Sequence, residues 1–177
     1  MATKLQFIAA HEVTSTVTSI SIDNVFTAEF DNYVIYARGL QTAGSTATYN
    51  LKLLQASDGA VVSNTNYTSM FESCKPNTSF GESRNASNSS GWIEFFGDPD
   101  LAPEGSGTVG RIYNPFASDQ FTYCTWRSQH AQGGSTNRFY YAAGVFLDTT
   151  SFRGFQISQG LTNDLTAGNF EIYGIAK

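Results

Sequence analysis

The side chains that most often carry out catalysis are scarce in this sequence. It contains two histidines, His11 beside Glu12 and His130 just after a segment that includes Trp126. Covalent catalysis needs a nucleophile held against a general base, and metal binding by histidine follows spacings such as HExxH. Neither histidine lies in a pattern of this kind. We therefore expect both to be exposed residues at the ends of strands.

One serine, Ser106, lies between two glycines and superficially matches a nucleophile elbow. The GxSxG pattern of that motif is absent, because Pro103 and Glu104 precede Gly105, and no helical pattern follows the serine. A glycan-cleaving enzyme would need two carboxylates about 5–10 Å apart, and nothing in the sequence proposes such a pair. We therefore expect no catalytic residue and no enzymatic activity.

Two groups of oxygen-bearing side chains have the composition of a calcium site but not the spacing of an EF-hand loop. Their members are Asp98, Asp100 and Glu104 in one group, and Asp23, Asn24, Asp31 and Asn32 in the other. Asp and Asn side chains also cap turns by bonding to the nearby backbone. Turn capping is the commoner role, so we predict no metal and no other cofactor, and calcium in these loops stays an open alternative.

The surface of this protein is expected to be neutral and polar. Charged residues make up 14% of the chain, against about 25% in a typical soluble domain. The net charge is -5 and the ten basic residues are scattered along the sequence, whereas nucleic-acid binding needs clustered Lys and Arg. No window approaches the roughly 20 apolar residues of a membrane helix, and the first residues lack a signal peptide. Binding to nucleic acid or to a membrane is therefore not expected.

Cys74 and Cys124 are the two cysteines of the chain. Without a secretion signal, the expected compartment is a reducing cytoplasm, which keeps thiols free. We predict two buried thiols, with a disulfide between them as the alternative.

Short apolar and β-branched runs alternate with clusters of Gly, Asn, Asp and Ser, a pattern typical of all-β proteins. Strands are expected at residues 4–10, 16–22, 32–38, 46–55, 67–74, 92–96, 108–113, 121–128, 138–148, 154–158 and 169–175. Residues 76–90 are rich in Asn, Ser and Gly and are expected to form a long exposed loop. About ten strands without helices predict an antiparallel, jelly-roll-like β-sandwich of two sheets, formed by residues 1–177 as a single domain.

Aromatic residues are abundant, with 14 Phe, nine Tyr and two Trp. Phe121, Tyr123 and Phe139 occupy alternate strand positions and are expected to fill the core. Other aromatics must lie outside it, because Phe139, Tyr140 and Tyr141 are consecutive and a strand places them on both faces. Exposed aromatics mark protein interfaces or platforms for sugars. The candidates for such an interface or ligand site are Trp92, Trp126, Phe116 and Tyr140.

Three parts of the sequence resemble a group of virion proteins from tailed bacteriophages. These parts are TSFRGFQI with GNFEIYGIAK at residues 150–157 and 168–177, FDNYVIY with Gly39-Leu40 at residues 30–40, and GTVGRIYNPF at residues 107–116. The resemblance implies a β-sandwich of the kind found on phages of cyanobacteria and other aquatic hosts. Related proteins occur as capsid decoration proteins and as modules of tails. The group carries no catalytic motif to transfer.

Two functions follow from this resemblance. The first is a decoration or cement protein made in the host bacterial cytoplasm, which binds the outer capsid surface and stabilises the particle. Its partners would be other virion proteins, above all the major capsid protein, and further copies of itself. The alternative is a tail-associated receptor-binding module that recognises a host glycan through loops 64–69 and 76–90, with Trp92 and Trp126 as the first stacking candidates.

Overall fold

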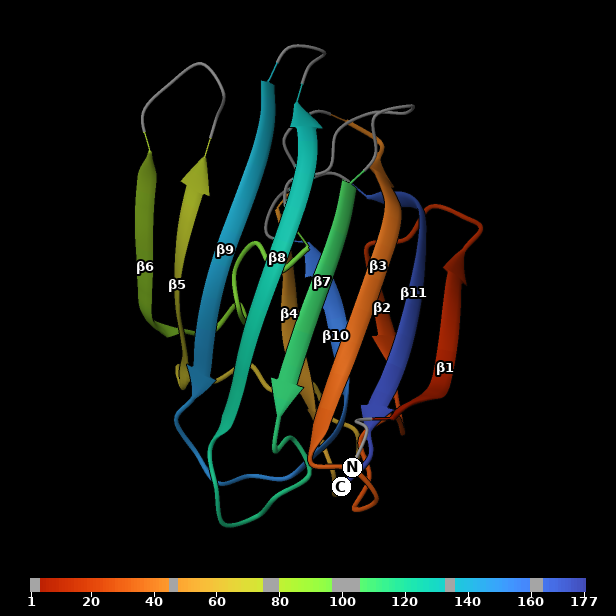
Figure 1. The fold of residues 1–177 in the computed structure, drawn as a ribbon, viewed down its shortest axis with the longest axis vertical. Coiled ribbons are helices and arrows are strands. Elements are labelled where there is room, and N and C mark those ends of the chain that lie inside the picture. Colours follow the sequence, from red (N-terminus) through yellow and green to blue (C-terminus); the bar gives the residue numbers. More distant parts are fainter. Residues whose placement is uncertain (1–3, 45–47, 75–79, 97–105, 133–135, 160–163) are drawn as a thin grey trace.

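The computed structural model describes residues 4–44, 48–74, 80–96, 106–132, 136–159 and 164–177. Its regular structure consists of eleven strands in two antiparallel sheets (Figure 1). The strands are β1 (Leu5–Val13), β2 (Ser19–Ile22), β3 (Asn32–Thr42), β4 (Tyr49–Gln55), β5 (Tyr67–Cys74), β6 (Gly81–Asn88), β7 (Ser106–Tyr113), β8 (Thr122–Gln132), β9 (Thr136–Phe146), β10 (Phe152–Gln159) and β11 (Leu165–Ile175). The predicted two-sheet, all-β sandwich is confirmed.

The larger sheet has eight strands in the order β1-β11-β3-β7-β8-β9-β5-β6, and the smaller sheet has three in the order β2-β10-β4. Early and late strands pair with one another, β1 with β11 and β2 with β10, which is the nested pairing of a jelly-roll-like sandwich. In contrast, β7, β8 and β9 follow one another as a meander. Figure 1 shows the smaller sheet behind β3, β7 and β8, whereas β5 and β6 extend beyond it.

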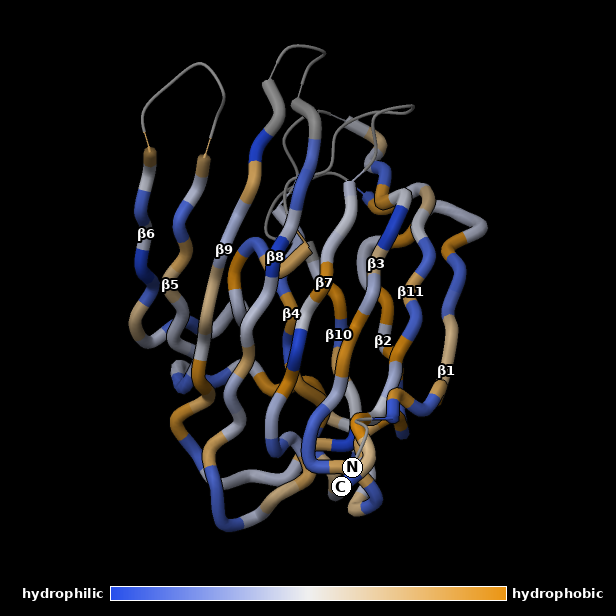
Figure 2. Tube along the Cα trace, viewed as in Figure 1, coloured by the Kyte–Doolittle hydropathy of each residue, from blue (hydrophilic) through white to orange (hydrophobic). Residues whose placement is uncertain are grey.

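The core lies between the two sheets because their strands turn alternate apolar residues inward. On β2, Ile20 and Ile22 are buried while Ser19 and Ser21 are exposed, as the sequence alternation predicts. The core side chains of the smaller sheet also include Leu51, Leu53, Phe155 and Ile157, and those of the larger sheet include Tyr33, Ile35, Ile112, Phe170 and Ile172. In Figure 2, hydrophobic and hydrophilic colours both occur along β2, β4 and β10, as expected for strands with only one face in this core.

The predictions for residues 76–96 are wrong in two places. Residues 81–88 are not a loop but strand β6, which pairs with β5 at the edge of the larger sheet. Polar residues suffice there, because the smaller sheet does not extend over β6 (Figure 1). Backbone hydrogen bonds to β5 hold the strand in place. Residues 92–96 are not a strand but a turn, in which Glu94 has a φ of 55°. Trp92 forms an isolated bridge to Leu51 on β4, and the Phe96 amide donates to the Tyr49 carbonyl at 3.3 Å.

The predicted phases of β8 and β9 are also wrong. Phe121, Tyr123 and Phe139 were expected in the core, but all three are exposed. The residues that point inward on β8 are Thr122, Cys124, Trp126, Ser128 and His130. Tyr123 and Trp126 differ by an odd number of positions, so a regular strand cannot bury both, and the larger indole takes the core.

Candidate functional site on the outer face of the larger sheet

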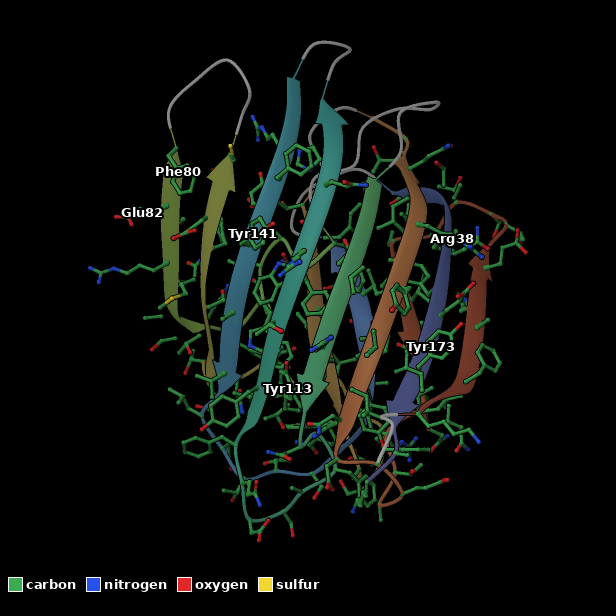
Figure 3. The ribbon with its side chains drawn as sticks, in the orientation of Figure 1. Arg38, Phe80, Glu82, Tyr113, Tyr141 and Tyr173 are labelled. Carbon is green, nitrogen blue, oxygen red and sulfur yellow. The ribbon has the colours of Figure 1, made fainter. Side chains whose placement is uncertain are left out.

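The outer face of the larger sheet, which is turned away from the smaller sheet, carries many large exposed side chains. Aromatic and aliphatic residues on it are more than a third exposed, among them Tyr36, Met70, Val109, Tyr123, Phe139 and Tyr141. In Figure 3, Tyr141, Tyr113, Arg38 and Tyr173 come from four different strands and all lie on this face. Exposed aromatic and arginine side chains gathered on one face are typical of a binding surface.

Strand register aligns the residues of this face in rows across the sheet. One row runs Tyr36, Val109, Arg127, Tyr141, Glu72 and Glu82 from β3 to β6. The next row runs Val34, Arg111, Thr125, Ala143, Met70 and Arg84. Long side chains therefore surround the two short ones at the centre, Thr125 and Ala143.

An open hollow of about 1300 Å³ lies over these short side chains. Its lining includes Arg111 and Arg127 on one side, Tyr141 beside them, and Met70 and Glu72 on the side of β5. The hollow exists because the short side chains of Thr125 and Ala143 form its floor, while the longer side chains around them form its rim. A smaller hollow of about 530 Å³ adjoins it over β3, β7, β8 and β9.

Arg111 and Arg127 at the larger hollow differ from Arg38, Arg153 and Lys177, each of which forms an ion pair. Arg127 lies over the ring of Tyr141, 5.0 Å from its centroid, in a cation–π contact that fixes both side chains. In the described part of the chain, neither Arg127 nor Arg111 forms an ion pair. Both guanidinium groups therefore remain available to an external anion, on a protein whose net charge is -5.

A hydrogen-bonded network lies at the other side of the face, over β3 and β11. Arg38 donates to Glu171 Oε1 at 2.6 Å, and the Tyr173 hydroxyl donates to Glu171 Oε2 at 3.0 Å. The bond to the Glu171 carboxylate favours the neutral phenol and raises the pKa of Tyr173. Tyr173 also packs edge-on against Tyr36 and Phe7, with ring centroids 5.7 and 5.6 Å apart. These partners hold the side chains of this region in place.

No family model, curated protein or solved structure matched this chain. The outer face and its hollow therefore carry the functional argument by their own geometry.

Three of the four candidates taken from the sequence lie in the core, which corrects their expected role. The exposed fractions are 0% for Trp92, 2% for Trp126 and 4% for Tyr140. Trp126 stacks on Phe95 with ring centroids 5.0 Å apart and donates from its indole to the Glu94 carbonyl at 3.2 Å. Such indoles fill the sandwich and offer no face on which a sugar can stack.

Phe116, the fourth candidate, lies in the turn between β7 and β8 and is half-buried. Asn114 begins this turn with a φ of 55° and donates its amide to the Asp31 carbonyl at 2.6 Å. The turn is therefore fixed to the end of the sandwich, away from the hollow. Phe116 and the outer-face residues are not brought together.

The two histidines have different environments. His11 is exposed, as expected, but His130 is buried. Its ring stacks on Tyr140 with centroids 5.4 Å apart. The expectation of two exposed histidines is therefore wrong for His130, which is a packing residue of β8.

The two cysteines are free, and only one of them is buried. Cys124 points into the core, where burial raises the pKa of its thiol. Cys74 is exposed, opposite Phe139 on the outer face. The prediction of free thiols agrees with this arrangement, whereas the prediction that Cys74 is buried is wrong. Residues on opposite faces of a sheet cannot form a disulfide.

The oxygen-rich groups give no metal site in the described residues. Asp23 accepts two hydrogen bonds from Arg153, at 2.6 and 2.8 Å, which lower the pKa of its carboxyl. Asp31 pairs with Lys177 at 2.9 Å. Asp98, Asp100 and Glu104 lie outside the described residues. Across the part of the chain that the structure describes, no three His, Cys, Asp or Glu residues gather as metal ligands.

Ser106 is not placed for catalysis. It is the first residue of β7, and its buried hydroxyl donates to the Phe96 carbonyl at 3.4 Å.

Within the described residues, no helix has the length and apolar character required to cross a membrane.

The sequence-based candidates missed the residues around the hollow. Arg127 lies between the buried Trp126 and Ser128, so the alternation of β8 places its side chain outside once the strand phase is known. Tyr141 follows the buried Tyr140 in the same way. Nothing in the sequence, however, indicates that Arg111, Thr125 and Ala143 are neighbours, because that depends on the register between strands.

Proposed function

We propose that this chain is a non-enzymatic surface protein of a bacteriophage particle, which binds the outer capsid shell through the outer face of its larger sheet. The observation that supports this most directly is the pair of neighbouring rows on that face, which present exposed Tyr, Arg, Val and Met side chains. Tyr, Met and Arg are enriched at protein interfaces, and Tyr and Arg are frequent binding hot spots. The resemblance of the sequence to tailed-phage virion proteins suggests the capsid as the partner.

The size of the face suits a stable interface. Its eight strands, spaced about 4.8 Å apart and 8–11 residues long, cover roughly 34 by 27–37 Å, or about 900–1250 Å². A standard protein interface buries about 800 Å² on each partner. One such contact is moderate in strength, and copies joined in an oligomer would bind the shell with avidity. We expect decoration of this kind to stabilise the particle against heat and expansion.

A catalytic role for the face has less support. Glu72 and Glu82 lie opposite each other on β5 and β6, but both side chains are exposed to solvent. The acid of a glycosidase pair is instead held protonated by an apolar or charged surrounding. The exposed setting of these carboxylates suits hydrogen bonding better than proton transfer.

The test is co-sedimentation with capsids that lack the protein. Purified protein is titrated onto such capsids, the particles are pelleted, and the bound copies are counted. Saturation at a number that matches capsid symmetry supports the proposal. Failure to bind while the protein remains folded by circular dichroism contradicts it.

A second candidate function is a tail-associated module that binds a host glycan, and the hollow is the observation that favours it. Open depressions bordered by an aromatic ring, arginines and carboxylates offer stacking and hydrogen bonds to a sugar. Binding to intact host cells, without binding to capsids, distinguishes this candidate from decoration.

A further inference from the structure

We propose that the hollow over Thr125 and Ala143 binds one acidic saccharide unit, whose carboxylate or sulfate group is held by Arg111 and Arg127. This inference rests on the second candidate function and names the class of glycan that it would recognise. The hollow lies on the face proposed for capsid contact, so glycan binding in the hollow and capsid binding are alternatives for that face.

The shape of the hollow is set by side-chain size and register. Thr125 and Ala143 lie directly opposite each other on β8 and β9, and both are exposed at the floor. Arg111 continues their row on β7, and Met70 continues it on β5. A volume of about 1300 Å³ exceeds that of a single sugar ring, so the ring can seat at the floor while its neighbours in a chain extend along the open face.

The two arginines are placed to share one anion. Arg111 lies opposite Thr125, and Arg127 lies two residues further along the same strand, so the pair are diagonal neighbours. Diagonal positions on adjacent strands are about 7–8 Å apart, a gap that two long side chains can close on one group. Guanidinium groups bind carboxylate and sulfate through paired, charge-assisted hydrogen bonds. Both are without an ion pair in the described residues.

The remaining groups on the rim suit a ring with hydroxyls. Tyr141, 54% exposed, presents its ring beside the floor, where it can pack against the apolar side of a sugar. Glu72 lies next to it in the same row and can accept hydrogen bonds from hydroxyls. Glu82 follows Glu72 and lines the hollow together with Arg84, so the side of β5 and β6 carries both signs of charge and offers no continuous positive strip to a peptide with a negative charge at successive residues. One anionic group with several hydroxyls therefore fits this surface better than a polyanionic peptide.

The test is calorimetric titration of the whole chain with four defined probes. These are maltohexaose carrying one glucuronate residue for the carboxylate, maltohexaose carrying one sulfate for the sulfate, unmodified maltohexaose as the neutral sugar, and polyglutamate as the acidic peptide. We expect one or both acidic saccharides to bind, with an affinity that falls as sodium chloride rises, and no binding of maltohexaose. Equal or tighter binding of polyglutamate would assign the hollow to an acidic protein segment and overturn the proposal.

Matched variants locate the site. Arg111→Gln and Arg127→Gln are each expected to weaken the acidic saccharide roughly tenfold or more, since each removes charged hydrogen bonds. Ala143→Phe should abolish binding by filling the floor, whereas Ala143→Ser should not. Arg38→Gln is the arginine control, because Arg38 lies on the same face and is already paired with Glu171. Circular dichroism confirms the fold of each variant.

The outcomes separate this inference from the function on which it rests. Host-cell binding that survives Ala143→Phe would overturn the hollow as the site and leave a receptor-binding role intact. Absence of binding both to host cells and to the acidic saccharides would overturn the inference and the second candidate together.

Discussion

Replacing Gly110 with alanine should destabilise the protein, whereas the same change at Gly107 on the same strand should not. A Cβ at position 110 would lie 2.6 Å from Cε1 of Phe95, well inside van der Waals contact. Phe95 cannot easily give way, because it is fully buried and stacks on Trp126. A Cβ at position 107 would meet its nearest atom, the Ala37 carbonyl oxygen, at an ordinary 3.7 Å.

The expected magnitudes follow from two opposing effects. Overpacking a core costs about 1–3 kcal/mol, while exchanging glycine for alanine stabilises by about 0.4–1 kcal/mol through the unfolded chain. Gly110→Ala should therefore lose about 1–2 kcal/mol, and Gly107→Ala should be neutral or slightly more stable. For a chain of this size, a gap of about 2 kcal/mol corresponds to roughly 4–8 °C in Tm.

Thermal unfolding followed by circular dichroism measures this gap. If Gly110→Ala is as stable as Gly107→Ala, or if the order is reversed, then the phase of β7 is wrong. In that case Val109 and Arg111 would point into the core, and the hollow on the outer face would not exist as described. The experiment therefore tests the geometry on which the functional proposals depend.

Three other outcomes check separate parts of the structure. Trp126→Ala should lower the free energy of unfolding by about 3–5 kcal/mol because it empties a core position. Tyr123→Ala, on the exposed side of the same strand, should lower it by less than about 1 kcal/mol. Urea unfolding measures both losses, and equal losses would contradict the phase of β8. The hydrogen bonds from Arg153 lower the pKa of Asp23 in the folded protein. The Asp23 carboxylate therefore contributes its full stabilisation above the pKa of the unfolded chain, about 4. This contribution is lost as the pH falls through the lower pKa of the folded protein. The Tm difference between wild type and Asp23→Asn should therefore be constant near neutral pH and shrink below about pH 4, and a difference that does not shrink would contradict the pairing. Iodoacetamide should label Cys74 and not Cys124 in the folded protein, since Cys124 is buried with a raised thiol pKa, and both in urea; mass spectrometry identifies the site, and rapid native labelling of Cys124 would refute its burial.

Strands with strict alternation of apolar and polar residues were predictable from sequence, because the apolar residues alone determine which face of the strand is buried. The run Ser19–Ile22 shows this plainly, with two buried Ile and two exposed Ser. The terminal strand is similar, since Phe170, Ile172 and Gly174 are buried on one face, as the sequence pattern predicts. In both cases the burial against the opposite sheet agrees with the local pattern.

Prediction failed where the local pattern was ambiguous or absent. The polar run Gly81–Asn88 forms β6 because pairing with β5 satisfies its backbone, and no apolar signal marks such an edge strand. On β8 the side chains of Tyr123 and Trp126 cannot share a face, so the sequence alone does not determine which of them is buried. The hollow could not be predicted from the sequence for a third reason. Arg111, Thr125 and Ala143 become neighbours only through the register of three strands.

The proposal that the chain binds a virion partner through its outer face is tested most directly by reversing one charge on each side of the sandwich. Arg111 lies on the outer face, whereas Lys52 lies on β4 in the row of Gln156, turned away from the core. Saturating co-sedimentation with capsids that lack the protein is compared for wild type, Arg111→Glu and Lys52→Glu. We expect Arg111→Glu to lose most of the bound copies and Lys52→Glu to keep them. Full binding by Arg111→Glu, or loss confined to Lys52→Glu, would contradict the proposal.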